Sequence, residues 1–261
     1  LAMHRSAGII GASGYSGIEL TRLLLGHRGV KLAWATSDRW VGQSVRSRTG
    51  LPSELNYLSN EQGLASSKSC GVVFLATPAP TSLELAPKLR ALGVQVVDLS
   101  GSFRLKDATR YPAFYQFEHT APALLQEAVY GLPELFREKI RRAQFVSNPG
   151  CYATVATLCV APLLQAGLID PTSIVINAAS GVSGAGRRAN EEFSFMDVDS
   201  DFRAYKTLKH QHLPEIEQTL GVKLVFTPHL LPIKRGILST AVARLKSGVS
   251  QAQVHEALGC A

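Results

Sequence analysis

The feature that most constrains the fold is a glycine-rich turn between an apolar strand and a helix. Residues Ala7 to Ile10 form a short apolar run, and GASGYSG follows at once, with Gly11, Gly14 and Gly17 three residues apart. The next residues, IELTRLLL, have helical periodicity. This order is typical of a dinucleotide-binding unit, because glycine lets the backbone approach a pyrophosphate at the helix N-terminus.

The turn itself supplies the first predicted cofactor contacts. Tyr15 and Ser16 are predicted to be loop residues, with Ser16 as the N-cap of the helix. The spacing G-x-x-G-x-x-G differs from the commoner G-x-G-x-x-G, so a tight turn without a ligand is the alternative. The expected contacts are Gly11, Ser13, Gly14, Tyr15, Ser16 and Gly17.

Strands and helices continue to alternate after the turn. Apolar runs at residues 31–36, 71–77 and 94–100 are predicted strands, and residues 81–92 have helical periodicity that Gly93 ends. Such alternation predicts an α/β fold with a Rossmann-type parallel sheet. Its ligands should bind at the carboxyl ends of the strands.

A chain of 261 residues, 46% of them apolar, predicts two domains. We place the first at residues 1–147 and the second at 148–261, because the last strand-like segment ends near Val146. The net charge of +7 is scattered, so anionic metabolites fit as well as nucleic acid. We expect no membrane or nucleic-acid partner, and a cytoplasmic location, or a plastid one in a plant.

The residues after the second predicted strand bear on the choice of cofactor. An NAD site usually places a carboxylate there, whereas an NADP site offers hydroxyl and arginine donors to the 2′-phosphate. Ser37 and Arg39 favour NADP, and Asp38 keeps NAD open. A solvated loop without a ligand is the third alternative.

The motif SNPGCYAT places a thiol where a helix is predicted to begin. The run that follows Gly150 has helical spacing, so Cys151 should lie at or next to the helix N-terminus. Free N–H groups and the helix dipole stabilise a thiolate there, which makes Cys151 a predicted nucleophile. The alternative, a cysteine that only packs, fits Cys159 better. We expect Pro162 to bend or end this helix early.

A nucleophilic thiolate needs a group that moves protons, and the motif HQHLPEIE offers two histidines before a helix that ends at Gly221. Spacing does not choose between His210 and His212; we favour His210. Glu215 is expected to orient a histidine. The alternatives are a metal site formed by the same three residues, and two histidines on the surface.

Seven motifs in order resemble one family: GASGYSGIEL, DLSGSFRL, AVYGLPEL, SNPGCYAT, SGVSGAGR, HQHLPEIE and TPHLLPIKRGIL. They closely resemble N-acetyl-γ-glutamyl-phosphate reductase, a relative of aspartate-semialdehyde dehydrogenase in arginine biosynthesis. The resemblance covers nearly the whole chain. It implies an NADPH-dependent oxidoreductase in which a second, mixed α/β domain carries catalysis and the contacts of a homodimer or homotetramer.

The resemblance also implies a mechanism. Cys151 attacks the acyl phosphate, phosphate leaves, and hydride from NADPH reduces the thioester to a thiohemiacetal that collapses to the semialdehyde. A histidine of HQH manages protons, and no metal takes part. By matching position, cofactor contacts are expected at Ser180, Gly181, Gly184 and Gly186, and substrate contacts at Arg104, Asn148, Ser183 and Arg235.

Two departures from the family pattern change the expectations. Where the family usually has Leu-Pro-His-Gly, this chain has ATPAPTS, so Thr77 and Pro78 become the expected cofactor contacts. The family also continues for several tens of residues past the position of Ala261, so we expect a C-terminal part to be missing. The rival functions are a reductase of another acyl phosphate, aspartyl or aminoadipyl, and a non-catalytic nucleotide-sensing protein.

Overall fold

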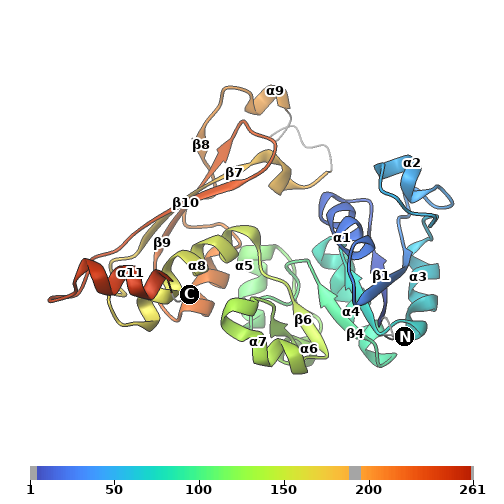
Figure 1. The fold of residues 1–261 in the computed structure, drawn as a ribbon, viewed down its shortest axis with the longest axis horizontal. Coiled ribbons are helices and arrows are strands. Elements are labelled where there is room, and N and C mark those ends of the chain that lie inside the picture. Colours follow the sequence, from blue (N-terminus) through green and yellow to red (C-terminus); the bar gives the residue numbers. More distant parts are fainter. Residues whose placement is uncertain (1–4, 188–194, 260–261) are drawn as a thin grey trace. The chain divides into compact units, whose positions relative to one another are not determined.

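A computed structural model describes residues 5–187 and 195–259 of the chain. The chain divides into two compact units (Figure 1). The first unit contains Leu1–Pro112 and Phe117–Pro149, and the second contains Ala113–Gln116 and Gly150–Ala261. Among the helices of the described residues, none is long and apolar enough to cross a membrane.

The first unit is built on a parallel sheet of six strands in the order β2-β1-β3-β4-β6-β5. Strand order reverses at β1, the position where sheets of this kind bind ligands at their carboxyl edge. The predicted Rossmann-type sheet is therefore confirmed. Its strands are β1 (Arg5–Ile10), β2 (Val30–Ala35), β3 (Val72–Leu75), β4 (Gln95–Asp98), β5 (Val129–Tyr130) and β6 (Phe145–Ser147).

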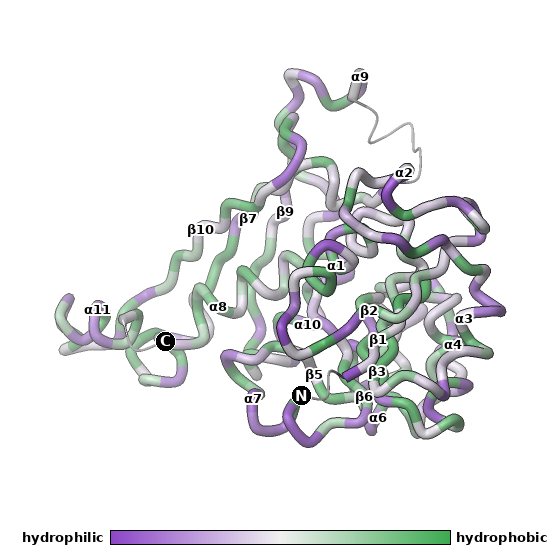
Figure 2. Tube along the Cα trace, turned by 45° about the vertical axis from the view of Figure 1, so that its right-hand side comes forward, coloured by the Kyte–Doolittle hydropathy of each residue, from purple (hydrophilic) through white to green (hydrophobic). Residues whose placement is uncertain are grey.

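The interior strands of this sheet are apolar along the chain, as expected where helices cover a parallel sheet. In Figure 2 the short strand β3 is coloured hydrophobic, and three of its four residues are buried. The helices of this unit are α1 (Tyr15–Leu25), α2 (Val45–Thr49), α3 (Asn60–Ser66), α4 (Ala79–Ala91), α6 (Pro122–Glu127) and α7 (Pro133–Arg142). The short helix α5 (Tyr111–Tyr115) lies where the chain passes between the units.

The start of α1 corrects one prediction. The helix begins at Tyr15, so Tyr15 and Ser16 belong to its first turn and Ser16 is not the N-cap. Gly14 takes that position because its backbone is extended, with φ −73° and ψ 167°. A glycine offers no side chain to cap the N–H groups of the first turn.

The second unit contains a mixed sheet in the order β10-β7-β9-β8. Strands β7 and β9 are parallel, whereas β10 and β8 pair antiparallel at the two edges. The strands are β7 (Val175–Gly181), β8 (Arg203–Ala204), β9 (Val225–Leu231) and β10 (Ile237–Val242). The helices are α8 (Cys151–Gln165), α9 (Phe195–Val198), α10 (Leu213–Leu220) and α11 (Gln251–Gly259). The expected mixed α/β architecture is confirmed.

Helices α8 and α10 cover one face of this sheet. Ala156 and Val160 of α8 share a buried core with Ile176 of β7, Ile216 of α10 and Phe226 of β9. Cys159 packs against this core, as predicted for a cysteine without a reactive role. The core thus fixes the two helices that carry the cysteine and histidine motifs.

Helix α8 does not end at Pro162 as expected. It continues to Gln165, and the backbone N–H of Ala166 donates to the carbonyl of Pro162 at 3.0 Å. Proline removes one donor but still accepts, so the next turn can close behind it. The helix is therefore a full 15 residues long, which gives Cys151 a long helix behind its N-terminus.

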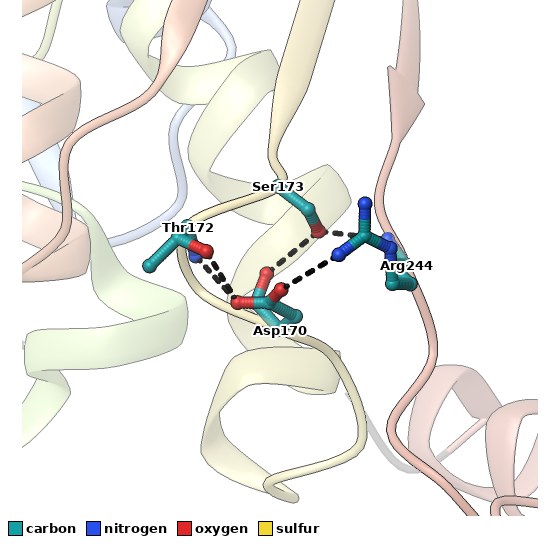
Figure 3. Close-up of polar contacts among 4 residues, drawn as sticks. All are labelled: Asp170, Thr172, Ser173 and Arg244. Atoms are coloured by element: carbon teal, nitrogen blue, oxygen red, sulfur yellow. Dashed lines mark hydrogen bonds and ion pairs between the residues drawn. The ribbon is translucent and has the colours of Figure 1, made fainter.

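A turn after α8 is hydrogen-bonded to the segment that follows β10 (Figure 3). The Asp170 carboxylate accepts from the backbone N–H and the hydroxyl of Thr172 at 2.9 and 2.7 Å, and lies 3.6 Å from the Arg244 guanidinium. The backbone N–H of Arg244 donates to Ser173 Oγ at 2.8 Å. The two hydrogen bonds from Thr172 hold the pKa of Asp170 below its usual value, the backbone bond contributing most. The contacts of Arg244 with Asp170 and Ser173 join the start of β7 to the segment that leaves β10.

Candidate active site

The three glycines of the first turn meet three different physical demands. Gly11 has φ +87°, and a Cβ there would lie 2.8 Å from the Ala76 carbonyl oxygen. A Cβ at Gly17 would lie 2.6 Å from the Gly11 carbonyl oxygen, so only glycine lets α1 pack this closely on the turn. At Gly14 nothing lies within 4 Å. Gly14 and the uncapped start of α1 therefore fit the pyrophosphate of a dinucleotide.

The loop after β2 is held by a short hydrogen-bond network. Thr36 Oγ1 accepts from the Gly11 N–H at 3.1 Å and donates to Asn60 Oδ1 at 2.5 Å. Both oxygens of the Asp38 carboxylate accept from Asn60, at 2.8 Å from its backbone N–H and at 2.6 Å from its side chain. Asp38 is thereby held against the start of α3.

The two predicted NADP donors of this loop differ in exposure. Ser37 is 2% exposed and its hydroxyl is buried without a hydrogen-bond partner among the described residues, whereas Arg39 is exposed. A ligand at the surface of the loop would therefore meet the Arg39 guanidinium rather than the Ser37 hydroxyl. From the sequence alone, Ser37 and Arg39 were equal candidates for binding the 2′-phosphate. Which of the two side chains is buried depends on how the loop folds back, and the sequence does not show this.

The segment after β3 lies beneath the glycine turn. The methyl group of Thr77 would lie 2.8 Å from a Cβ at Gly11, and its hydroxyl is 2.7 Å from that of Ser82. Pro78 is exposed and is the N-cap of α4, which begins two residues earlier than the predicted helix. Thr77 therefore shapes the turn from within; contact with a cofactor stays a prediction for both residues.

In the second unit, Cys151 is the first residue of α8 and is exposed. Gly150 is the N-cap, and its carbonyl accepts from the Thr154 N–H at 2.8 Å. The Gly150 N–H donates to Oε1 of the buried Glu215 at 2.7 Å. Glu215 thus holds the backbone beside the thiol; its expected role in orienting a histidine stays a prediction. Free thiols are also found at Cys70 and Cys159; Cys260 lies outside the described residues.

The two histidines are buried, so the alternative that they lie on the surface is wrong. A Cβ at Gly150 would lie only 2.2 Å from His212 Nε2, so the His212 ring stands directly over the residue that precedes Cys151. No group of three potential metal ligands is present among the described residues. The arrangement instead combines a helix N-terminus, an exposed thiol and an imidazole.

His210 has a different environment. Its Nδ1 accepts from the His212 backbone N–H at 3.1 Å, and its Nε2 lies 3.5 Å from the Tyr205 hydroxyl. The two histidine rings are edge to face, with centroids 4.8 Å apart. Burial, with a smaller effect of the Lys206 charge, lowers the pKa of His210 to about 4. His210 is therefore neutral near pH 7, with both ring nitrogens in contact with protein groups.

Two tyrosines of this region were not identified from the sequence. The Tyr152 hydroxyl donates to the His229 carbonyl at 2.9 Å, and the Tyr205 hydroxyl donates to that of Tyr152 at 3.3 Å. The position of Tyr152 directly after Cys151 was the one sequence signal that could have identified it as part of the site. No spacing rule relates residues 152, 205 and 229, because their contact arises only when the sheet forms.

The glycine-rich loop after β7 is joined to the loop before β10. The backbone N–H groups of Gly181 and Val182 donate to the carbonyls of Gly236 and Ile233, at 2.9 and 3.0 Å. A Cβ at Gly181 would lie 2.7 Å from the Ile233 carbonyl oxygen. The exposed Arg235 is thereby placed on the same paired loops as Ser180, Ser183, Gly184 and Gly186. Substrate and cofactor contacts by these residues stay predictions.

Arg104 lies inside the first unit rather than on its surface. Its Nε donates to the Asn148 carbonyl at 2.8 Å and its Nη2 to the Leu99 carbonyl at 3.0 Å. The Asn148 N–H in turn donates to the Asp98 carbonyl at 2.7 Å. Burial, the largest effect, raises the pKa of the Asp98 carboxyl. Arg104 therefore braces the ends of β4 and β6, and a direct role of Arg104 or Asn148 in binding substrate stays a prediction.

Family models match both halves of the chain. The model for the semialdehyde dehydrogenase NAD-binding domain matches residues 6–143, and that for the semialdehyde dehydrogenase dimerisation domain matches residues 151–260. Among solved structures, aspartate semialdehyde dehydrogenase II from Vibrio cholerae has a TM-score of 0.76 at 15% identity. The match covers 98% of this chain and 79% of that one, and it establishes a shared fold.

Curated relatives define the family more narrowly. The N-acetyl-gamma-glutamyl-phosphate reductase of Magnetococcus marinus is 45% identical over 96% of this chain and 74% of its own length. The enzyme of the same name from Symbiobacterium thermophilum is 44% identical over 92% of this chain and 71% of its own length. With this identity over nearly the whole sequence, the chain belongs to the N-acetyl-γ-glutamyl-phosphate reductase family of the semialdehyde dehydrogenases.

Proposed function

We propose that the chain reduces N-acetyl-γ-glutamyl phosphate to N-acetylglutamate semialdehyde with release of phosphate, a reaction of arginine biosynthesis. The observation that carries the proposal is the exposed thiol of Cys151 at the N-terminus of α8, next to the ring of His212. Relatives more than 40% identical carry the name of this activity. A sensor without catalysis would need neither the thiol nor the imidazole there.

The residues of the second unit suit each step. The Cys151 thiolate, favoured by the helix dipole, attacks the acyl carbon, and phosphate leaves as a thioester forms on the sulfur. His212 takes the thiol proton and gives it to the oxygen of the reduced adduct, then takes it back as the C–S bond breaks, the semialdehyde leaves and the Cys151 thiolate is restored. Glu215 keeps the Gly150 backbone in place beneath the imidazole. When bound, NADPH supplies the hydride that reduces the thioester.

Replacing the nucleophile tests the mechanism. Cys151→Ser should abolish phosphate-dependent reduction of NADP by N-acetylglutamate semialdehyde, the reverse reaction, while cofactor binding stays nearly intact, because a serine hydroxyl is a poor nucleophile at neutral pH. Cys159→Ser, which alters only a packed thiol, is the control and should be active. A Cys151 variant with a tenth of the wild-type rate would rule out the covalent mechanism. A wild type that accepts only aspartate semialdehyde would favour the rival substrate.

The two histidines should differ in their effect on rate. We assign proton transfer to His212, because burial lowers the pKa of His210 to about 4 while the His212 ring lies over Gly150. His212→Gln should lose ~10²–10⁴ in kcat, the loss expected when a group that moves protons is removed. His210→Gln should lose less, and the exposed control His27→Gln should keep the wild-type rate. A larger loss in the His210 variant than in the His212 variant would reverse the assignment.

We infer that NADP is preferred over NAD. Asp38, the residue that would favour NAD, has both carboxylate oxygens engaged by Asn60, while the guanidinium of Arg39 is exposed in the same loop. A guanidinium suits a 2′-phosphate, since it forms charge-assisted hydrogen bonds with phosphate oxygens. Ser37, being buried, would support the loop rather than bind the phosphate.

Removing the Arg39 charge tests this preference. A charge-assisted contact is worth ~1.5–3 kcal/mol, so Arg39→Ala should weaken NADPH binding about 10- to 150-fold and leave NADH binding almost unchanged. Titration of both cofactors against wild type and variant measures the difference. Arg28→Ala, another exposed arginine of the first unit, is the control. An equal loss for both cofactors would place Arg39 away from the 2′-phosphate.

We also propose a homodimer formed through the uncovered face of the second sheet. Leu238, Ala179 and His229 lie side by side on this face, and Val242, Val175 and Val225 form a second row. Leu238 is 70% exposed and Val242 59%, whereas the alternate residues Ile176 and Phe226 are buried under the helices. Exposed apolar rows of this kind indicate an interface, and the matched model describes this region as a dimerisation domain.

A charge on this face should prevent association. Leu238→Lys is expected to reduce the mass of the particle to that of one chain in analytical ultracentrifugation, because the lysine would be buried without a partner. Leu23→Lys is the matched control, since Leu23 is 54% exposed on α1 of the first unit. An unchanged mass for the Leu238 variant would place the interface elsewhere.

A further inference from the structure

We propose that Tyr205 is a positioning residue of the reaction: through a one-way chain of hydrogen bonds it fixes His210 in a single neutral tautomer, and His210 in turn holds His212 beside Cys151. The proposal rests on the proposed function for the roles of Cys151 and His212. The contacts described above for Tyr205 are with Tyr152 and His210, so its proposed effect on Cys151 is indirect. Tyr205 follows the edge strand β8 and begins the segment that leads to the two histidines.

The direction of the chain is set by its last member. The His229 carbonyl can only accept, so the Tyr152 hydroxyl donates to it at 2.9 Å. A hydroxyl has one proton, so Tyr152 must accept from Tyr205, at 3.3 Å. Tyr205 must likewise accept from His210 Nε2, at 3.5 Å, and this requires a proton on Nε2.

The other side of the His210 ring leads to the same tautomer. Its Nδ1 lies 3.1 Å from the backbone nitrogen of His212, which can only donate. Nδ1 accepts this bond only in the tautomer that Tyr205 also favours, so the two contacts select the Nε2–H form together and the loss of either weakens the selection. Because the bond is made to the backbone of His212 and the two rings pack edge to face, a change in the His210 ring would displace His212.

A second proton on His210 does not fit this environment. It would lie on Nδ1, where it would face the N–H of His212. The groups around the ring are Tyr205, Lys206, Tyr152, His212 and Phe226. None of them carries a negative charge at neutral pH, since burial, the largest effect, raises the pKa of Tyr152; hydrogen bonds with Tyr205 and Ser180 oppose this rise. The neutral state thus follows from geometry as well as from burial.

The segment between Tyr205 and His210 supports the proposal independently. Lys206 and Leu208 both have left-handed backbone conformations, with φ +44° and +58°. Such conformations are unfavourable for residues with a Cβ and persist where the surrounding structure imposes them. Leu208 is 56% exposed, so burial of its side chain does not explain the strain. The segment is forced into a tight loop that returns the chain from Tyr205 to a histidine in contact with it.

The test removes one oxygen atom. Tyr205→Phe keeps the ring but takes away the acceptor for His210 Nε2–H, so kcat should fall about 10-fold while KM changes less than twofold. In ¹⁵N-detected NMR of the histidines at pH 7, the wild type should show His210 as the Nε2–H tautomer alone. The variant should show a mixture of the two neutral tautomers. Tyr130→Phe, a half-buried tyrosine of β5, is the control and should match the wild type in both measurements.

A second variant tests whether the contacts act in series. Tyr152→Phe interrupts the same chain one step later, so it should have the same effect on the tautomer. The double variant should lose no more activity than the worse single variant, because either substitution alone already interrupts the series of hydrogen bonds. Losses that multiply would overturn the proposal, as would an active Tyr205→Phe enzyme with an unchanged His210 tautomer.

The outcome is separable from that of the proposed function. A fall in kcat with no change of tautomer would show that Tyr205 acts by another route and would also overturn the proposal. If the wild type failed to reduce NADP with N-acetylglutamate semialdehyde and phosphate, the proposed function would fail. The NMR comparison needs no substrate, and would still decide whether Tyr205 fixes the His210 ring.

Discussion

The hydrogen bond from the Gly150 N–H to the buried Glu215 carboxylate is the contact on which the cysteine site depends. It spans 2.7 Å and joins the N-terminus of α8 to α10. A carboxylate buried without a donor is costly, so the two helix starts must stay together for Glu215 to be satisfied. At that distance the His212 ring occupies the space of a side chain at position 150. The placement of Cys151 next to an imidazole rests on this contact together with the bond that joins the His212 backbone to His210.

Close approach, rather than backbone freedom, explains two of the important glycines. Gly150 has φ −69°, which any residue adopts, and Gly17 lies within α1. Each is required because an adjacent group fills the space of a Cβ: the His212 ring in one case and the Gly11 carbonyl in the other. Gly11, with φ +87°, is required by its conformation as well. A motif written only as glycines and gaps does not distinguish these reasons.

Local signals made much of the fold predictable from the sequence. The glycine turn, the alternating strands and the Pro-Gly entry to Cys151 each depend on a few neighbouring residues, and the structure places them as predicted. Ser16 failed as an N-cap because Gly14 already has the extended backbone that ends the turn. The burial of Ser37 and of Arg104 was not predictable, since each depends on contacts with segments more than 20 residues away or on how a loop folds back.

The motif H-x-H shows why residue type alone does not assign a role. Two identical side chains, two residues apart, meet different surroundings because His212 is the N-cap of α10 whereas His210 precedes the turn and lies against Tyr205 and Phe226. A neutral imidazole has one donor and one acceptor, and His210 finds one partner for each. An imidazole that exchanges protons must instead have a nitrogen available to the reacting groups. Both ring nitrogens of His210 are engaged in this way, which suits His210 to hold its neighbour in place and supports the proposal that the ring over Gly150 transfers protons.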